Sequence, residues 1–300
     1  MVYGVIFAGG YGKRLKPLTD DIPKVMLEIK RGYTILDRQL LDFKYSGIDE
    51  VYLLVGYKWR VIRERYGYTW EGLKLNYLVE KRPMGTLWAL RNCSMYLDDD
   101  AIVRNGDTVS DFNLKRMMRM ARDKEYGAII ALTRMKSPYA IVETEGERIT
   151  GFNEKPYLNY YINAGIYYLK KHVYKYLEAD YSGKEIERTF FPEIVSRGLV
   201  GAYFEDVGWF PVDNFKDLEE LRKEYKNRRD RNFGYIKRVE GGYEIFIKAL
   251  FDARLNIKGR ARIMEGRGII NEMNYNKGDI IDVDGRSIIM ALENTVMIIS

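Results

Sequence analysis

From its first residue to about position 232, the chain alternates short apolar runs with amphipathic segments. Apolar runs bounded by turn residues predict buried strands, and apolar positions three and four residues apart predict helices. Alternating strands and helices are typical of an α/β fold, in which helices flank a mostly parallel, twisted sheet. We expect strands at 5–8, 51–55, 73–79 and 101–105, with helices at 35–45, 60–66 and 86–95.

The pattern changes after position 131. Residues 140–154 alternate apolar and polar positions around the dipeptide Glu145-Gly146, which predicts an antiparallel hairpin, and 160–169 predict a further strand. A charged segment at 214–231 carries apolar residues at helical spacing. We expect this segment to form one helix that ends the domain.

The remainder of the chain has a different pattern of apolar and turn residues. Residues 233–300 consist of short β-like runs separated by glycine-containing turns, without proline. We therefore predict two domains, 1–232 and 233–300, the second a small all-β roll. The segment NKGDIIDVDG is reminiscent of a cupin-type roll, and the sustained six-residue repeat of a left-handed β-helix is absent. Because the histidines that would hold a metal in such a roll are missing, we expect a structural, oligomerisation or regulatory role, which leaves a homo-oligomer open.

Composition limits the class of protein. The chain has 300 residues, 46% hydrophobic and 31% charged, which suits a soluble globular protein. No apolar run approaches the roughly 18 residues of a membrane span, and no signal peptide is visible, so we expect a cytoplasmic protein without a membrane partner. One cysteine, Cys93, excludes an internal disulfide, and one histidine, His172, excludes a histidine-rich metal site.

The net charge of +6 raises the question of nucleic-acid binding. The basic residues are dispersed among 43 acidic ones, so we expect no nucleic-acid partner. The densest basic cluster, 223–231, includes Glu224 and Asp230, and we expect it to be the solvated end of a helix. Few Gln, Cys and His beside many Tyr, Lys, Arg and Glu are typical of a thermophile.

The first apolar run, VYGVIFA, ends at Ala8 and leads into a loop with Gly9, Gly10 and Gly12. Glycines free the backbone to turn several amide groups toward one anion. Cations follow at Lys13, Arg14 and Lys24, a distribution that suits a polyphosphate. A glycine-rich turn that merely connects a strand to a helix is the simpler alternative.

Two common glycine motifs do not fit this loop. The P-loop requires Ser or Thr after its Gly-Lys pair, where this chain has Arg14, and it requires a glycine five positions before Gly12 that is absent. The dinucleotide fingerprint requires a third glycine where this chain has Leu15. We therefore reject both motifs.

The string GGYGKRLKPLT followed by Pro23-Lys24 resembles the signature of the nucleotide-sugar pyrophosphorylases, also called sugar-1-phosphate nucleotidyltransferases. The resemblance implies a Rossmann-like nucleotide-diphospho-sugar transferase fold. It also implies transfer of a nucleotidyl group from a nucleoside triphosphate to a hexose 1-phosphate, with release of pyrophosphate. By the same resemblance, Arg14 holds the leaving phosphates, Lys24 contacts the α-phosphate and the sugar phosphate, and the nucleotide is bound by Ala8, Gly9, Gly10, Gly12 and Lys13.

Such a transfer needs two anions neutralised and aligned, and it needs no covalent nucleophile. Asp107, in the segment NGD, and Asp206, in FEDVG, resemble the two aspartates that hold Mg²⁺ in the family. Magnesium binds few carboxylates and bridges phosphate oxygens, which suits this pair. Each aspartate could instead cap a turn. After Asp206 this chain has Gly208-Trp209 where relatives have Gly-Thr, which puts the closure of that loop in doubt.

The resemblance extends to the sugar side. Glu154-Lys155-Pro156 would supply a carboxylate for sugar hydroxyls and a cation for the sugar phosphate. Asn163-Ala164-Gly165 would line the same pocket, with Asn163 bonding hydroxyls. The plain alternatives are an exposed tripeptide for the first segment and a strand bulge for the second.

For the base, Glu80 followed by Gly85-Thr86 resembles the family segment that packs against the nucleotide. A carboxylate only accepts hydrogen bonds, which suits the adjacent donors of guanine, so we expect GTP, with mannose 1-phosphate as the first sugar. Leu87 replaces the usual alanine. The alternatives are UTP or dTTP with glucose 1-phosphate, a non-catalytic subunit that binds nucleotide sugar, and a glycosyltransferase, which would need a DxD pair where this chain has NGD.

Overall fold

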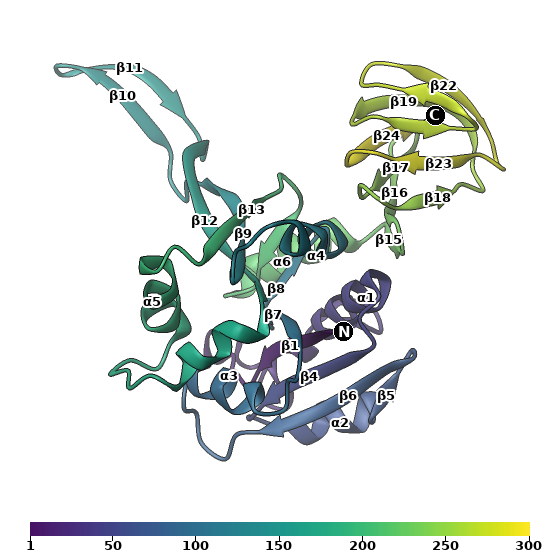
Figure 1. Ribbon diagram of the computed structural model, residues 1–300. Helices are drawn as coiled ribbons and strands as arrows, with labels where there is room; N and C mark the ends of the chain where they lie inside the picture. The colour runs from purple at the N-terminus through teal and green to yellow at the C-terminus, as the bar shows by residue number, and fades with distance from the viewer.

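The computed structural model describes residues 1–300. An eight-stranded sheet forms the centre of the larger domain (Figure 1). The strand order is β13 (Val200–Phe204), β9 (Ala128–Lys136), β12 (Tyr157–Leu169), β7 (Asp100–Asn105), β1 (Val2–Ala8), β4 (Glu50–Val55), β6 (Leu73–Val79) and β5 (Thr69–Trp70).

The sheet is mostly parallel, as predicted. Strands β7, β1, β4 and β6 run parallel to one another, as do β13 and β9. Strand β12 is antiparallel to both of its neighbours, and β5 is antiparallel to β6. The four parallel strands at the centre therefore end at one edge of the sheet.

Helices cover both faces of this sheet. Adjacent β1 residues alternate between the faces, so that Ile6 packs in one core and Val5 in the other. The Ile6 face carries α1 (Ile35–Ser46), α2 (Trp59–Tyr66) and α4 (Leu114–Asp123), and the Val5 face carries α3 (Thr86–Ser94), α5 (Phe190–Ser196) and the 3₁₀ segment η3 (Lys171–Glu178). None of the helices combines the length and the apolar character that crossing a membrane requires.

Local signals set the helix limits where the sequence predicted them. Helix α1 begins after Thr34, whose hydroxyl accepts the Asp37 N–H while the Asp37 carboxylate accepts the Thr34 N–H. It ends at Gly47, which has a φ of 82°. Capping chemistry is local, so it is readable from the sequence.

The predicted hairpin is present and forms an arm. Strands β10 (Ile141–Glu145) and β11 (Arg148–Asn153) pair antiparallel around Gly146. Their side chains are almost all exposed, and the pair projects away from the central sheet (Figure 1). The arm therefore contributes nothing to the core of the domain.

The predicted helix at 214–231 is wrong in its last third, 226–231. Helix α6 (Phe215–Tyr225) ends early, and Arg228–Arg231 form strand β15. The basic cluster is accordingly not a solvated helix end, since the Arg228 side chain is only 1% exposed and lies against Asp111. An extended backbone places Arg228 and Asp230 on the same buried face of the strand, which a helix would not do.

The C-terminal module is all-β, as predicted. One sheet contains β15, β16 (Gly234–Val239), β17 (Gly242–Ile247), β24 (Thr295–Ile299), β19 (Lys258–Glu265) and β22 (Ile280–Asp284). The other contains β18 (Asp252–Arg254), β23 (Ile288–Ala291), β20 (Gly268–Ile270) and β21 (Met273–Tyr275). Residues of both sheets share one hydrophobic core. The first strand, β15, comes from before the boundary placed at position 232.

A buried ionic network joins the module to the larger domain. Arg228 binds Asp111, and the Lys248 Nζ lies 3.3 Å from Asp42 Oδ1 and donates to the Phe112 carbonyl at 2.9 Å. The network has more cations than anions, and its members are Arg38, Arg104, Arg228, Lys248, Asp42, Asp111 and Asp230. Burying an isolated charge costs free energy. Each charged side chain at this junction therefore depends on its oppositely charged partners from the other domain or the same one.

Candidate active site

The carboxyl ends of four parallel strands meet at one edge of the sheet. Ala8 of β1 is level with Val55 of β4, and Val55 is level with Val79 of β6. The Glu80 N–H donates to the Val55 carbonyl at 2.8 Å, and the Gly106 N–H donates to the Phe7 carbonyl at 3.1 Å. Residues that follow each strand are therefore brought together, in the position where open α/β sheets bind ligands.

A cavity of about 340 Å³ opens at this edge. Eight of the residues predicted from the sequence line it: Ala8, Gly9, Gly10, Lys24, Glu80, Gly85, Thr86 and Asp107. Nine further residues line it that were not predicted as site residues, and those with polar or ring side chains include Tyr11, Asn105 and Glu187. Tyr11 could have been noticed, because it lies inside the glycine loop.

The glycine loop takes a backbone conformation that needs glycine at one position. Gly12 has a φ of +61°, and a Cβ there would lie 2.8 Å from the Thr19 methyl carbon. The Thr19 hydroxyl donates to the Gly12 carbonyl at 2.9 Å, which holds the turn. Lys13 and Arg14 follow in a short 3₁₀ segment, are exposed, form no ion pair, and do not line the cavity.

Lys24 lies between two carboxylates. Its Nζ donates to Asp107 Oδ2 at 2.9 Å and to Asp213 Oδ1 at 3.2 Å. The Lys24 side chain is 12% exposed, whereas those of Asp107 and Asp213 are 40% and 49% exposed. A cation already occupies the point where the two carboxylates converge, so the pair is arranged to hold positive charge.

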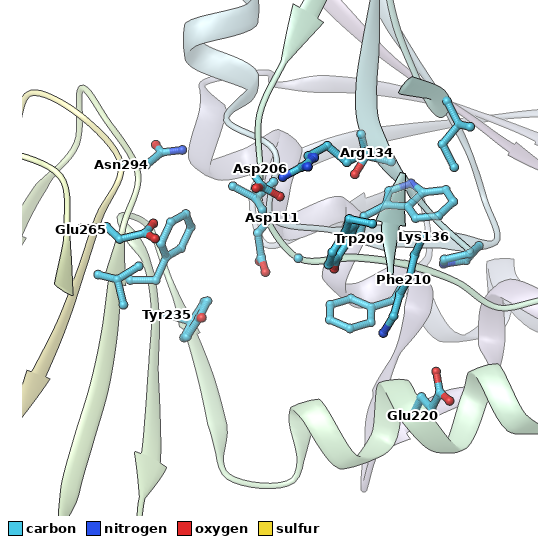
Figure 2. Close-up of a pocket in the computed structure, with 18 of the residues that line it drawn as sticks. Asp111, Arg134, Lys136, Asp206, Trp209, Phe210, Glu220, Tyr235, Glu265 and Asn294 are labelled. Atoms are coloured by element: carbon cyan, nitrogen blue, oxygen red, sulfur yellow. The ribbon is translucent and has the colours of Figure 1, made fainter. Parts of the chain in front are cut away.

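The structure does not bring Asp206 to Asp107. Asp206 lines a separate cavity of about 510 Å³ between the larger domain and the C-terminal module. Figure 2 shows it grouped with Asp111 and Arg134, facing Asn294 and Glu265 of the module. Asp213 takes the predicted place of Asp206, and the available signal was the short apolar run that it terminates, 209–212, which contains β14 (Trp209–Pro211).

Glu80 stands on the cavity wall with an unused hydrogen-bonding atom. Its carboxylate accepts a hydrogen bond from the backbone of Met84, but its Oε1 is buried and has no partner. Burial raises the pKa of this carboxyl, and the Met84 hydrogen bond opposes that rise only in part. Buried polar atoms are normally paired, so this oxygen indicates a ligand that brings donors to it.

The start of α3 forms another wall of the cavity. Gly85 has a φ of +91°, and a Cβ there would lie 2.5 Å from the Lys184 carbonyl oxygen. The next residue, Thr86, accepts the Ile186 N–H on its hydroxyl at 3.0 Å. These contacts fix the segment before Glu187, which is how a residue distant in sequence reaches the cavity.

The two predicted sugar-side segments behave differently. Asn163 donates to the Tyr167 hydroxyl at 2.8 Å, and that hydroxyl donates to the Glu187 carboxylate at 3.3 Å, so Asn163 connects to the cavity through its neighbours. Gly165 faces Asn105, with room for no side chain between them. The side chains of Glu154 and Lys155 are exposed near the base of the arm, where Lys155 Nζ lies 3.6 Å from Glu154 Oε1. Neither residue lines the cavity.

Comparison with known proteins adds an independent line of evidence. A family model described as nucleotidyl transferase matches residues 3–240. The D-glycero-α-D-manno-heptose 1-phosphate guanylyltransferase of Campylobacter jejuni is 32% identical over 226 residues, which are 71% of this chain and 97% of that protein. The mannose-1-phosphate guanyltransferase of Yarrowia lipolytica is 30% identical over 226 residues, covering 72% of this chain and 61% of that protein.

Solved structures agree with the fold. HddC from Yersinia pseudotuberculosis matches with a TM-score of 0.59 and 25% identity, covering 75% of this chain and 100% of that chain. The family match ends at residue 240, so most of the C-terminal module lies outside it.

Proposed function

Since the chain belongs to the nucleotidyl transferase family and is a sugar-1-phosphate nucleotidyltransferase, we propose that it transfers GMP from GTP to a sugar 1-phosphate of manno configuration, with release of pyrophosphate. Mannose 1-phosphate is the first candidate. The unpartnered Glu80 Oε1 in the cavity is the observation that carries the choice of base.

Guanine presents a ring N–H and an exocyclic amino group side by side, and a carboxylate accepts from both. One Glu80 oxygen already accepts from the Met84 backbone, and the second is free to accept from the base. Uracil and thymine offer one ring N–H flanked by two carbonyl oxygens, and these oxygens would be repelled by the carboxylate oxygens. GTP is therefore preferred over UTP or dTTP.

The two curated relatives described above support the manno configuration. One is named for a manno-heptose 1-phosphate and the other for mannose 1-phosphate, and both are guanylyltransferases. A manno-heptose 1-phosphate is thus the second candidate, and glucose 1-phosphate is the alternative of different stereochemistry.

In the proposed reaction, Lys24 neutralises charge on the α-phosphate and the incoming sugar phosphate. It is held in place by Asp107, so its ammonium group is fixed before the substrate arrives. Lys13 and Arg14 lie in the glycine loop without carboxylate partners, and we assign them to the leaving phosphates. The incoming phosphate oxygen is itself the nucleophile, so the protein supplies alignment and charge alone.

We also propose that Asp107 and Asp213 hold Mg²⁺. The donor set fits, because magnesium is held by one or two carboxylates, keeps several waters, and takes substrate phosphates as further ligands. When bound, the ion would offset charge on the phosphate oxygens.

The test is pyrophosphate release with Mg²⁺ present, across GTP, UTP, dTTP, ATP and CTP against mannose, manno-heptose and glucose 1-phosphates. We expect turnover with GTP and a manno sugar, lost in Asp107→Ala. Lys171→Ala, which changes an exposed lysine that does not line the cavity, is the control. Equal turnover with UTP or dTTP would overturn the assignment of the base, and equal turnover with glucose 1-phosphate would overturn that of the sugar.

Five broader expectations complete the proposal: a cytoplasmic location, a thermophilic source, a homo-oligomeric state, no nucleic-acid partner and no membrane partner. The dispersed basic residues support the absence of nucleic acid. Light scattering on the purified chain tests the oligomer, and activity after heating tests the thermal origin.

A further inference from the structure

A third cavity, distant in sequence from the glycine loop, opens at the C-terminal module. It measures about 940 Å³ and is lined by residues of β15, β16, β17 and β18, by the segments that flank these strands, and by Lys30 of β2 (Glu28–Lys30) in the larger domain. The four module strands belong to the two different sheets of the module. Both sheets of the module therefore contribute to the cavity.

Strand pairing places basic side chains on the face that lines this cavity. Arg229 is opposite Ile236, and Ile236 is opposite Ile245 of the module core. Directly opposite residues in an antiparallel pair share a face, and alternate residues along a strand do too. Arg231 and Arg238 therefore lie on the same face as Arg229. Arg254 enters from the other sheet, at the end of β18.

These cations have no protein partner. Arg229, Arg231, Arg238 and Arg254 form no ion pair, and their guanidinium groups form no hydrogen bond within the chain. Arg228, one residue before Arg229, has its guanidinium bound to Asp111 and Asp230. On strand β15, the arginine on one face is therefore paired with carboxylates, and the arginines on the opposite face, Arg229 and Arg231, have no ion-pair partner.

The lining of the cavity is strongly unbalanced in charge. Lys226 adds a further exposed, unpaired cation, and Asp252 is the one carboxylate among the residues that line it. Like charges gathered in a concave site raise the local positive potential. Guanidinium groups match phosphate oxygens with paired, charge-assisted hydrogen bonds, and Tyr243 provides an exposed ring beside them.

We propose that this cavity binds a small molecule that carries phosphate groups, at a site separate from the catalytic cavity. A concave site of this size encloses a phosphorylated metabolite, whereas an extended nucleic acid would need a basic stripe across the surface. Inward-pointing charges can also protect an edge strand from pairing with other chains. That explanation accounts for Arg229 and Arg231 on the edge strand β15 and for Arg254 on the edge strand β18, but it does not account for Arg238, which lies on the inner strand β16.

Calorimetric titration of the full chain with inorganic pyrophosphate tests the proposal. We expect two classes of site in the wild type, because the catalytic cavity also accepts this anion. Lys24→Ala should weaken one of them. The double variant Arg229→Ser/Arg238→Ser should weaken the other at least tenfold and leave the first unchanged.

Arg262→Ser is the matched control. Arg262 is an exposed, unpaired arginine of the same sheet that does not line the cavity. Its removal lowers the net charge by one, against two in the double variant, and should leave both classes of site intact. Thermal unfolding at the wild-type temperature would show that the double variant is folded, as expected for exposed side chains.

Three results would overturn the proposal. The first is a single pyrophosphate site that disappears in Lys24→Ala. The second is unchanged binding in the double variant. The third is an equal loss in Arg262→Ser, which would indicate a general effect of net charge.

Discussion

The Lys24 Nζ lies 2.9 Å from Asp107 Oδ2, although 83 positions separate the two residues in the chain. Lys24 comes from the segment after the glycine loop, and Asp107 comes from the end of β7. The third member of the group, Asp213, is 189 positions from Lys24 and follows β14. The fold thus collects one cation and two carboxylates from three separate connections.

The Lys24 ammonium should be essential for turnover. Lys24→Ala removes the positive charge expected to face the phosphates in the transition state, so we expect kcat to fall by about 10²- to 10³-fold. Pyrophosphate release under saturating substrates measures this. Lys16→Ala, which changes an exposed lysine paired with Asp20, should retain wild-type kcat. A wild-type kcat in Lys24→Ala would contradict the assignment.

Asp213, rather than Asp206, should act with Asp107. Asp213→Asn removes a charged oxygen from the group around Lys24, so we expect the Mg²⁺ concentration for half-maximal activity to rise by roughly tenfold or more. Asp206→Asn should leave this concentration unchanged, because Asp206 lines another cavity. A metal titration of both variants decides between them. The reverse pattern would restore the sequence-based pair of Asp107 and Asp206.

Glu80 should control the choice of base. Glu80→Gln keeps the shape but replaces one acceptor with a donor, so we expect kcat/KM for GTP to fall by roughly 10- to 100-fold. Burial raises the pKa of Glu80, so its neutral form should appear at a higher pH than for an ordinary carboxyl. The kcat/KM for GTP should therefore decline as the pH falls toward that raised value, with a flatter profile in Glu80→Gln.

The same pKa shift predicts the stability of Glu80→Gln. A carboxyl whose pKa is raised by folding destabilises the folded state at pH values above that pKa, where it is charged in both states. We therefore expect Glu80→Gln to match or exceed wild-type stability at neutral pH. Chemical denaturation without nucleotide measures this. A large loss of stability would mean that Glu80 Oε1 also has a partner in the folded chain.

The junction between the domains should depend on Arg228. Arg228→Ala leaves Asp111 and Asp230 buried without their main cation, so we expect unfolding free energy to fall by about 3–5 kcal/mol. Arg229→Ala is the matched control, since the neighbouring side chain is exposed and unpaired. Urea denaturation of both variants measures the difference. Equal stability of the two variants would contradict a structural role for the network.

Acid should weaken the same junction. Burial acts to raise the pKa of Asp111, but the charge and hydrogen bonds of Arg228, together with the charges of Arg38 and Lys248, hold that pKa below its ordinary value of 3.8. Burial also acts to raise the pKa of Asp42, but the charges of Arg38, Lys248 and Arg104 together hold that pKa well below the ordinary range. A lowered folded-state pKa contributes stability above the unfolded value that is lost as pH falls. We expect stability to drop below about pH 4, and less steeply in Asp111→Asn.

The strand–helix alternation, the glycine loop and the capping residues were readable from the sequence because their causes are local. Period, turn chemistry and caps act within a few residues, so β1, α1 and the hairpin at Gly146 were predicted close to their observed limits. The segment 226–231 was misread because its charges suggested solvent exposure. The burial of Arg228 and Asp230 in this segment depends on Asp111 and Arg38, which no local pattern could connect to it.

The class of fold, the all-β character of the C-terminal module and eight of the residues that line the cavity at the sheet edge follow from the sequence alone, because residues that follow parallel strands must meet at one edge of the sheet. Only the tertiary structure decided that Asp213, and not Asp206, faces Lys24. It also decided that Glu80 keeps an unpaired oxygen and that four arginines share a cavity in the module. These relationships depend on contacts between segments far apart in the chain, and such contacts are set by packing rather than by local pattern.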